Sequence, residues 1–307
     1  MISVQNLRKE YNGKEVLKGV SFEIKEGEFF GLLGPNGAGK TTTISILSTI
    51  LSPDSGSVTI AGLDVRKQAQ KCKSLIGIVP QEIALYKEMS AFDNLMFWGS
   101  LYNLNRNTLK TKIFETLHLF GLADRMHDNI KEYSGGMMRR VNIASALLHN
   151  PKVLIMDEPT VGVDPQSRNL IFEVVEKLHH EGLTILYTTH YMEEAERLCE
   201  RLAIIDNGEI ITQGVKEELK KSVPMNELIK ISINNLNNEV FEKLASYWPH
   251  LKQEEETLLF SVNDSQKELA KVISKCNELN LEVKQIDIQK INLEMVFLHL
   301  TGKQLRD

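Results

Sequence analysis

A glycine-rich run between residues 34 and 42, GPNGAGKTT, carries the residues in this sequence best suited to bind a phosphate. The run fits the pattern G-x-x-x-x-G-K-[ST] from Gly34 to Thr41, after an apolar stretch and before a helical spacing. Glycines let the backbone wrap closely around phosphates with its N–H groups pointing inward, and the following helix N-terminus adds partial positive charge. The alternative, a flexible glycine turn before an ordinary helix, is disfavoured by this context.

Each polar side chain of this run has an expected role. Lys40 is placed to reach the β- and γ-phosphates, Thr41 to coordinate Mg²⁺, and Thr42 to add a phosphate contact. The residues of the run that we expect to bind a nucleotide are Gly34, Asn36, Gly37, Gly39, Lys40, Thr41 and Thr42.

A second group of chemistry-bearing residues ends an apolar strand, VLIMDEP, at residues 153–159. The hard Mg²⁺ ion prefers oxygen ligands, so the Asp157 carboxylate suits it, usually through water. Glu158 would then polarise the water that attacks the phosphate. A strand that merely ends in a solvated acidic turn is the alternative, but the presence of the phosphate loop argues against it. The two groups together predict a nucleoside triphosphatase, without indicating which kind.

Strand and helix patterns surround both groups and would hold them together. Short apolar runs suited to buried strands precede the phosphate loop, precede the acidic pair and recur at residues 183–190. Between the last two runs a helix is predicted, with Asp164 as its cap, Pro165 at its first position and Gly182 at its end. This alternation predicts a mostly parallel sheet covered by helices, an α/β fold. Amphipathic patterns at 85–150 predict a helical insertion into that core.

The composition is that of an ordinary folded chain of 307 residues, long enough for about two domains. A net charge of −5 gives no global basic field, so we expect no nucleic-acid partner. The three cysteines lie far apart in sequence and suggest reduced thiols in a cytosolic protein. The N-terminus has no apolar core of signal-peptide type, and no run approaches the roughly 20 apolar residues of a membrane span.

The stretch EYSGGMMRR at 132–140, together with the two groups above, resembles the signature of ATP-binding cassette ATPases, usually written LSGGQ. It stands where that family places it, after a helical insertion and before the acidic strand. The sequence departs from the pattern at Tyr133 and at Met137, since methionine lacks the hydrogen-bond donors of glutamine. Further family marks match in order along residues 1–220: Tyr11 as the aromatic that stacks on adenine, Gln81 of the Q-loop, Asp164 of the D-loop and His190 as the switch histidine.

The resemblance implies a P-loop NTPase core of the RecA-like kind that hydrolyses ATP with Mg²⁺. It implies catalytic roles for Glu158, His190 and Gln81, and metal ligation by Thr41, Gln81 and Asp157. It also implies a head-to-tail homodimer, with ATP between the phosphate loop of one subunit and the signature of the other. Outside the phosphate loop, the residues that we expect to contact nucleotide are Tyr11, Ser134, Gly135, Gly136 and Asp164.

Several of these residues also have simpler explanations. Tyr11 could be a plain surface aromatic, Gln81 a polar residue after a turn, and His190 a structural histidine. Ser134 could simply cap a helix. We expect it to do so, while the same helix N-terminus presents N–H groups to a γ-phosphate.

The C-terminal stretch INLEMVFLHLTGK, from residue 291, resembles the closing segment of cassette ATPases that serve bacterial drug-resistance, sodium-efflux and multidrug exporters. The main hypothesis is therefore the ATPase subunit of an exporter, cytoplasmic and peripheral at the inner face of the cell membrane. An integral-membrane permease, a separate chain, would dock over residues 82–105 near Gln81; the alternative is that this stretch simply packs the helical insertion. A soluble cassette ATPase without a transporter and an importer ATPase are the alternatives. The transported substrate cannot be read from the sequence.

A polar break that contains a proline, KKSVPMNE, divides the chain into a nucleotide-binding domain at 1–222 and a C-terminal domain at 223–307. The second segment carries no nucleotide motif and predicts a small α/β domain with the order βαβαβα. By resemblance to the exporter group, we expect a regulatory or dimer-supporting role for it. Its last helix has an apolar stripe that must be buried, formed by Leu293, Val296, Phe297 and Leu300.

Overall fold

The computed structural model describes residues 1–223, 227–233, 238–254, 257–279 and 281–301. The chain forms two compact units, one containing Met1–Lys216 and the other Glu217–His299. Within the described ranges, no helix is both long enough and apolar enough to cross a membrane.

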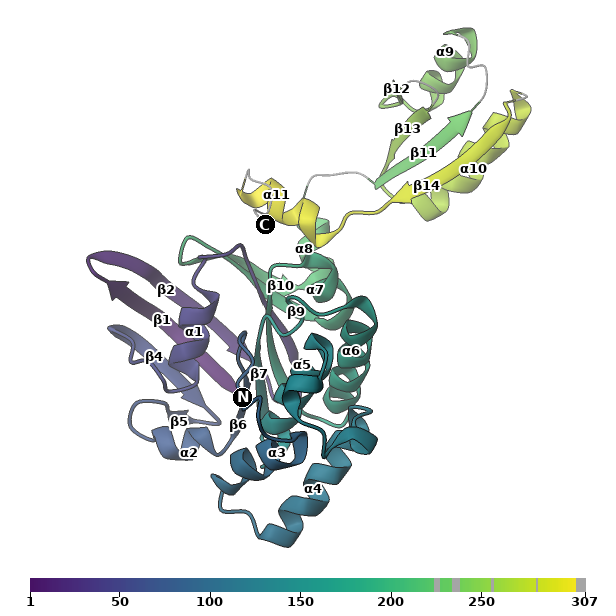
Figure 1. Ribbon diagram of the computed structural model, residues 1–307. Helices are drawn as coiled ribbons and strands as arrows, with labels where there is room; N and C mark the ends of the chain where they lie inside the picture. Colours follow the sequence, from purple (N-terminus) through teal and green to yellow (C-terminus); the bar gives the residue numbers. More distant parts are fainter. Residues whose placement is uncertain (224–226, 234–237, 255–256, 280, 302–307) are drawn as a thin grey trace. The chain divides into compact units, whose positions relative to one another are not determined.

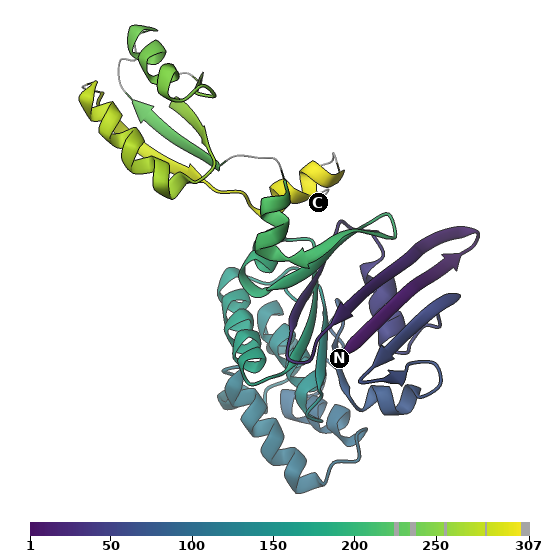
Figure 2. The same cartoon turned by 180° about the vertical axis from the view of Figure 1, so that it is seen from behind.

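A six-stranded sheet with the order β10-β9-β3-β8-β7-β6 forms the centre of the first unit (Figure 1), and Figure 2 shows this unit from behind. β10 runs antiparallel to β9, and all other neighbours are parallel, as predicted. β3, β7 and β8 are buried along their whole length, which explains the apolar run that each contains. The strands are β3 (Phe29–Leu33), β6 (Ile76–Val79), β7 (Val153–Asp157), β8 (Thr184–Thr189), β9 (Arg201–Asp206) and β10 (Glu209–Val215).

A second, antiparallel sheet with the order β2-β1-β4-β5 packs against the central sheet. Helix α1, which follows the phosphate loop, joins the two: its Ile44 belongs to one hydrophobic cluster with Leu17 of β2 and Leu32 of β3. The aromatic rings of Phe22 in β2 and Phe30 in β3 stack with centroids 5.5 Å apart. These elements are β1 (Ile2–Tyr11), β2 (Lys14–Ile24), α1 (Lys40–Leu47), β4 (Ser55–Ile60) and β5 (Leu63–Asp64).

The predicted amphipathic helices between the sixth and seventh strands are present as α3, α4 and α5. Helix α6 has the predicted ends, because the Asp164 carboxylate accepts a hydrogen bond from the Ser167 N–H at 2.9 Å and Gly182 has φ +98° just beyond the last turn. The helices of this unit include α2 (Ala69–Lys73), α3 (Ala91–Ser100), α4 (Arg106–Leu119), α5 (Gly135–Leu147), α6 (Pro165–His180) and α7 (Met192–Leu198).

The second unit contains an antiparallel sheet with the order β12-β13-β11-β14 and the helices α9 and α10. Its β-α-β-β-α-β succession is the ferredoxin-like pattern. The predicted alternation of strands and helices is present, but β12 is an addition that the sequence did not indicate, since its three residues are polar and exposed. The elements are β11 (Glu227–Ile233), α9 (Asn238–Tyr247), β12 (Lys252–Glu254), β13 (Thr257–Val262), α10 (Ser265–Glu278) and β14 (Val283–Gln289).

Two further helices flank this sheet in the sequence, α8 (Lys216–Ser222) and α11 (Leu293–Thr301). The stripe predicted in α11 is buried at Leu293, Val296 and Phe297, whereas Leu300 is 40% exposed. The burial prediction is therefore right for the first two turns of this helix.

Candidate functional site

Four of the predicted site segments meet at one edge of the central sheet, because the parallel strands β3, β6, β7 and β8 all end there. The phosphate loop follows β3, and Gln81 comes shortly after β6. Asp157 is the last residue of β7, and His190 directly follows β8. Segments far apart in the sequence are thereby placed side by side.

The glycines of the phosphate loop have different structural reasons. A Cβ at Gly34 would lie 2.1 Å from the carbonyl oxygen of Ile205 in β9, so only glycine fits there. Gly39 has φ +111°, and a Cβ would lie 2.6 Å from Cδ2 of Leu17. Gly37 has φ +81°, yet a Cβ there would meet no atom of the described residues within 4 Å. Packing therefore requires the outer two glycines, whereas only the backbone conformation requires Gly37.

Lys40 places its ammonium group beneath this loop. Nζ donates to the carbonyl oxygens of Gly34 at 2.6 Å and Pro35 at 3.1 Å, and it forms an ion pair with Oε1 of Glu158 at 2.9 Å. The side chain is only 4% exposed. A buried ammonium group needs such oxygen partners because desolvation disfavours an unpaired charge.

Glu158 is the residue on which the predicted catalytic side chains converge. Its Oε2 lies 3.1 Å from Nδ1 of His190 and 3.5 Å from Nε2 of Gln81, while Oε1 faces Lys40. Its backbone has φ +45°, a region that non-glycine residues seldom adopt, and its N–H donates to Oγ1 of Thr188 at 3.1 Å. A buried carboxylate fixed in this way is positioned to accept a proton.

Asp157 and Thr41 bring two further oxygen groups together beside Glu158. The Asp157 carboxylate accepts a hydrogen bond from Oγ1 of Thr188 at 2.7 Å, and the Thr41 hydroxyl is near enough to affect its pKa. Burial raises the pKa of Asp157, and the hydroxyls of Thr188 and Thr41 oppose that shift. A carboxylate in contact with a hydroxyl supplies the hard oxygen donors that Mg²⁺ requires, so these residues fit the predicted metal.

The signature residues form a second group at the N-terminus of α5. Oγ of Ser134 accepts a hydrogen bond from the Met137 N–H at 3.2 Å, so Ser134 caps the helix as expected. A Cβ at Gly136 would lie 2.1 Å from Oγ of Ser167 and 2.7 Å from Oδ2 of Asp164. The signature and the D-loop aspartate therefore pack directly on each other. Beside them lies a pocket of ≈ 500 Å³, lined in part by Ser134, Met137, Arg140 and Asp164.

The two departures from the family pattern share one partner, Arg125. The hydroxyl of the buried Tyr133 donates to the carbonyl oxygen of Arg125 at 2.7 Å. The Arg125 guanidinium lies 5.3 Å from the Tyr133 ring centroid and contacts Sδ of Met137 through Nη1 at 3.6 Å. The residues at these two positions are thus accommodated locally, and Ser134 keeps its capping role.

Four predicted residues lie outside these contacts. Tyr11 ends β1 with 44% of its surface exposed, and Nζ of Lys9 lies 5.7 Å from its ring centroid. Asn36 is exposed on the phosphate loop, and Thr42 is half-buried in the first turn of α1. A Cβ at Gly135 would lie 3.8 Å from the carbonyl oxygen of Gly162. Their contacts with nucleotide stay predictions.

Two polar residues of α5 reach the segment that carries Gln81, and the sequence reasoning missed both. The guanidinium of Arg139 donates to the carbonyl oxygens of Pro80 at 2.8 Å and Gln81 at 2.5 Å. Oδ1 of Asn142 accepts from the Ala84 N–H at 3.2 Å. Their separation by three positions, which puts both on one helix face, is the only signal of this pair in the sequence.

Glu194 of α7 is a third residue that the sequence reasoning missed. Its buried carboxylate accepts hydrogen bonds from the hydroxyls of Thr160 at 2.6 Å, Tyr187 at 3.0 Å and Thr189 at 2.8 Å. Thr160 follows the acidic pair, and Thr189 precedes His190. Glu194 thus fixes the two segments that carry Glu158 and His190.

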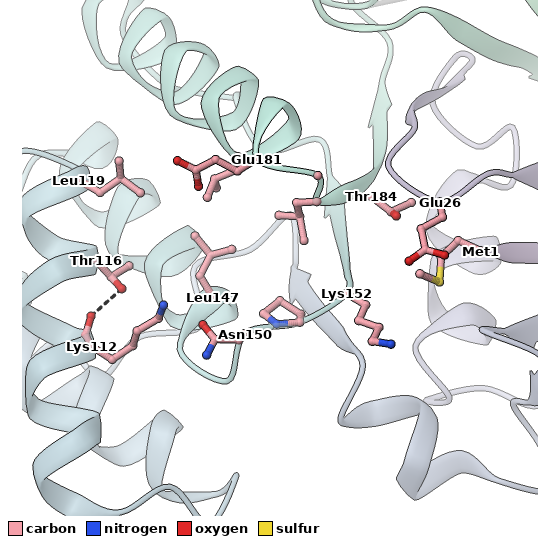
Figure 3. Close-up of a pocket in the computed structure, with 14 residues that line it drawn as sticks. Met1, Glu26, Lys112, Thr116, Leu119, Leu147, Asn150, Lys152, Glu181 and Thr184 are labelled. Atoms are coloured by element: carbon pink, nitrogen blue, oxygen red, sulfur yellow. Dashed lines mark hydrogen bonds between the residues drawn. The ribbon is translucent and has the colours of Figure 1, made fainter.

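A pocket of ≈ 440 Å³ lies at the opposite edge of the central sheet (Figure 3). Lys152 directly precedes β7 and Thr184 begins β8, so the pocket lies at the N-terminal ends of strands whose other ends carry Glu158 and His190. Its lining mixes leucines with lysines and glutamates. This cavity is separate from the nucleotide-site residues.

Comparisons with known proteins agree with the site. The family model described as ABC transporter matches residues 17–161. Linearmycin resistance ATP-binding protein LnrL of Bacillus subtilis (strain 168) is 44% identical, over 100% of both chains. Nod factor export ATP-binding protein I of Ralstonia nicotianae is 37% identical, over 100% of this chain and 95% of its own. Daunorubicin resistance ATP-binding protein DrrA3 of Streptomyces coeruleorubidus is 34% identical, over 99% and 97%.

Solved structures give the same result for the first unit. A dimeric ATP-binding cassette in a post-hydrolysis state, bound to ADP and Pi, has a TM-score of 0.65 at 28% identity and covers 70% of this chain and 98% of that chain. The predicted P-loop NTPase fold is therefore confirmed. Because the relatives align along the whole chain, the chain belongs to the ABC transporter family, as an ATP-binding subunit that hydrolyses ATP for transport.

Proposed function

We propose that ATP hydrolysis in this chain requires Mg²⁺ and that Glu158 accepts the proton of the attacking water. The observation that carries the proposal is the convergence of Lys40, His190 and Gln81 on one buried carboxylate. Thr41 and Asp157, with Gln81, would hold the ion. The ion, when bound, neutralises charge on the phosphates.

The contacts of Glu158 also suggest separate roles for the side chains around it. Lys40 Nζ already lies against oxygen atoms of the phosphate loop. The phosphate oxygens of ATP can therefore replace Glu158 as the partner of the Lys40 ammonium group. The carboxylate is then free on that side to orient water. His190 and Gln81 remain against its other oxygen and fix its direction.

The test is the Glu158→Gln variant, which keeps size and shape but cannot accept the proton. ATP binding should persist while turnover falls by ~10²–10⁴-fold, the usual contribution of general-base help. Phosphate release and equilibrium titration with ATP measure the two quantities. Glu115→Gln, at an exposed position of α4, is the matched control. Near wild-type hydrolysis by Glu158→Gln would remove this residue from the role.

We further propose that two copies close head to tail on ATP. The signature group presents the N–H groups of the α5 N-terminus beside Asp164, separately from the phosphate-loop group. In a two-fold dimer, the signature residues of each copy face the phosphate loop of the other copy. Two equivalent sites are completed in this way. The dimeric cassette bound to ADP and Pi supports this arrangement by similarity.

An exposed aromatic surface on the first unit supports a membrane partner. Tyr86 is 47% exposed, Phe97 39%, Leu101 60% and Tyr102 38%. The rings of Tyr86 and Phe97 meet edge to face at 5.2 Å. Two exposed aromatic rings in contact, with further exposed apolar side chains nearby in the sequence, are typical of a docking surface. The surface begins close to Gln81 in sequence, so a permease docked there, as a separate chain, could act on the catalytic edge.

The names of the relatives, two resistance proteins and an export protein, favour an exporter, as does the C-terminal stretch. The chain would then sit at the inner face of the cell membrane. The double variant Tyr86→Ser, Phe97→Ser should lower recovery of the chain with the membranes of its native cell while leaving ATPase activity of the purified chain unchanged. Phe114→Ser, 51% exposed on α4, is the matched control. Unchanged membrane recovery would contradict this docking surface.

A further inference from the structure

Arg139 and Asn142 of α5 are buried polar residues whose contacts point away from their own helix. Arg139 is 4% exposed and Asn142 1% exposed. They are three positions apart, so they lie on one face of α5. Together they hold the backbone of residues 80–84 at three points, through the carbonyl oxygens of Pro80 and Gln81 and the N–H of Ala84. This segment has no regular secondary structure of its own.

These contacts stabilise the fold less than apolar packing on the same face of α5 would. The partners of the Arg139 guanidinium are neutral carbonyl oxygens, and its Nε is buried without a hydrogen-bond partner among the described residues. Nδ2 of Asn142 is likewise buried and unsatisfied in the same part of the chain. A buried donor left without a partner lowers the stability of the folded chain, and a buried charge lowers it further. Apolar side chains would therefore stabilise this face better.

Asn94 of α3 provides a contrast within the same loop. It is completely buried, its Oδ1 accepts from the Tyr86 N–H at 2.8 Å, and its Nδ2 donates to the carbonyl oxygens of Tyr86 at 3.0 Å and Ser90 at 2.9 Å. Asn94 is thus satisfied through both of its polar atoms and anchors the distal part of the loop. Arg139 and Asn142, whose hydrogen bonds are incomplete, hold the first part of the loop. There Nε2 of Gln81 lies 3.5 Å from Oε2 of Glu158.

The geometry connects the two groups of the functional site within one chain. Helix α5 begins at the signature, with Ser134 as its cap, and one to two turns later it holds the Gln81 segment. A helix transmits a displacement along its axis as a nearly rigid rod. A shift of the signature therefore moves the Gln81 carbonyl that Arg139 holds, and with it the distance from the Gln81 side chain to the catalytic carboxylate.

We propose that Arg139 and Asn142 are positioning residues that clasp residues 80–84 to the signature helix, so that engagement of the signature sets the position of Gln81 against Glu158. The proposal rests on the head-to-tail closure described above. It explains why two incompletely satisfied polar residues stand where apolar packing would be more stable. The bidentate contact also explains the choice of arginine, since a lysine ammonium cannot reproduce a planar two-pronged fork.

The test compares variants that break single contacts of the clasp. Arg139→Lys keeps the charge and loses the fork, Asn142→Leu keeps the volume and loses the acceptor, and Asn142→Asp retains an acceptor for Ala84. Ser145→Ala is the matched control, because among the described residues the Ser145 hydroxyl bonds within α5, to the carbonyl oxygen of Asn142 at 2.7 Å. Thermal melting and ATP titration establish that each variant is folded and binds nucleotide.

Two readouts separate positioning from general stability. Arg139→Lys and Asn142→Leu should lower kcat by about tenfold or more while KM for ATP stays within about twofold, the pattern of a lost transition-state interaction. Hydrogen exchange of a fragment spanning residues 80–86, measured without nucleotide, should accelerate in Asn142→Leu, because the Ala84 N–H loses its acceptor. Asn142→Asp and Ser145→Ala should keep wild-type kcat and wild-type exchange.

The outcomes distinguish this proposal from the functional one. If Arg139→Lys and Asn142→Leu keep wild-type kcat, or if exchange of residues 80–86 is unchanged in Asn142→Leu, the clasp is overturned. If Asn142→Asp is as impaired as Asn142→Leu, the Ala84 contact is not the cause and the proposal is also overturned. A wild-type chain that hydrolyses ATP without dimerising would instead contradict the head-to-tail closure, and the exchange measurement would still decide the clasp.

Discussion

Lys40 and Glu158 form an ion pair of 2.9 Å in which the lysine side chain is 4% exposed and the glutamate side chain 6% exposed. The residue expected to hold the phosphates is thus paired with the residue expected to activate water. Each charge relieves the desolvation of the other, so removing one partner leaves the other buried and unpaired. If the two residues have these expected roles, their pairing makes ATP binding and hydrolysis interdependent.

The Lys40→Ala variant should bind ATP more weakly, by about tenfold or more, because a charge-assisted hydrogen bond to phosphate is lost. Titration calorimetry of the two proteins with ATP measures this loss. The variant should also melt at a lower temperature, because Glu158 is left unpaired. The double variant Lys40→Ala, Glu158→Gln should recover part of that stability but none of the affinity. Equal ATP affinity in wild type and Lys40→Ala would exclude a phosphate contact.

ATP should drive dimerisation of the Glu158→Gln variant, because slow hydrolysis preserves the bridging nucleotide. Sedimentation with ATP and Mg²⁺ should give a dimer, and ADP should give a monomer. Adding Ser134→Arg should abolish the dimer by placing bulk and charge in the closing interface. The capping bond from the Met137 N–H would be lost as well, so a melting curve must accompany the measurement. If the Glu158→Gln variant that retains Ser134 stays monomeric at saturating ATP, the head-to-tail dimer is ruled out for the isolated subunit.

The stability of the first unit should depend on pH through His149. Its ring stacks on Tyr102 at 3.8 Å between centroids, and its Nε2 lies 3.0 Å from the carbonyl oxygen of Ile76. Burial lowers the pKa of His149 from its usual 6.5, and the hydrogen bond to Ile76 only partly opposes this. The unfolded chain therefore takes up the proton first. As pH falls through the usual value toward the lowered pKa, the free energy of unfolding should fall.

The His149→Gln variant removes this titration. Denaturation measured from about pH 7 to about pH 5 should show a smaller loss of stability in the variant than in the wild type. His118→Gln, at an exposed position of α4, is the control and should follow the wild type. Parallel loss of stability in wild type and His149→Gln would show that His149 does not contribute.

For residues 223–307 we propose a regulatory or dimer-supporting role. A chain that ends at residue 222 should still bind ATP, because the phosphate-loop group and the signature group both lie in the first unit. Its dimer lifetime or hydrolysis rate should change. Wild-type hydrolysis, dimerisation and membrane recovery in the truncated chain would refute the role. Failure of that chain to fold would instead mean that the buried stripe of α11 belongs to the nucleotide-binding core.

The convergence of the motif residues at one end of the central sheet could be predicted, because these residues follow strands that must be parallel. Once β3, β7 and β8 are neighbours, Lys40, Glu158 and His190 have to meet. The clasp residues escaped prediction for the opposite reason. Arg139 is 58 positions from Gln81, and its contact exists only because α5 packs beside a loop without periodicity.

In the second unit, too, the local sequence pattern did not predict every element. The three polar residues of β12 have no alternation of their own, and they form a strand only because β13 offers an edge. The neighbouring pairs of this sheet, β11 with β13 and β11 with β14, are also antiparallel. The buried Glu194 likewise reads as one acid among several in α7, and only the approach of three hydroxyl groups reveals its role.

The unequal surroundings of the phosphate-loop glycines have a consequence for a library of single substitutions. Alanine at Gly34 would collide with the backbone of β9, so such variants should be depleted already among cells that accumulate folded protein. Alanine at Gly37 meets no atom of the described part of the chain within 4 Å and carries only the strain of a positive φ, about 1 kcal/mol, so these variants should accumulate. They should disappear only when survival demands transport. Two glycines of one motif would thus be lost under different selections, one for the fold and one for the ligand.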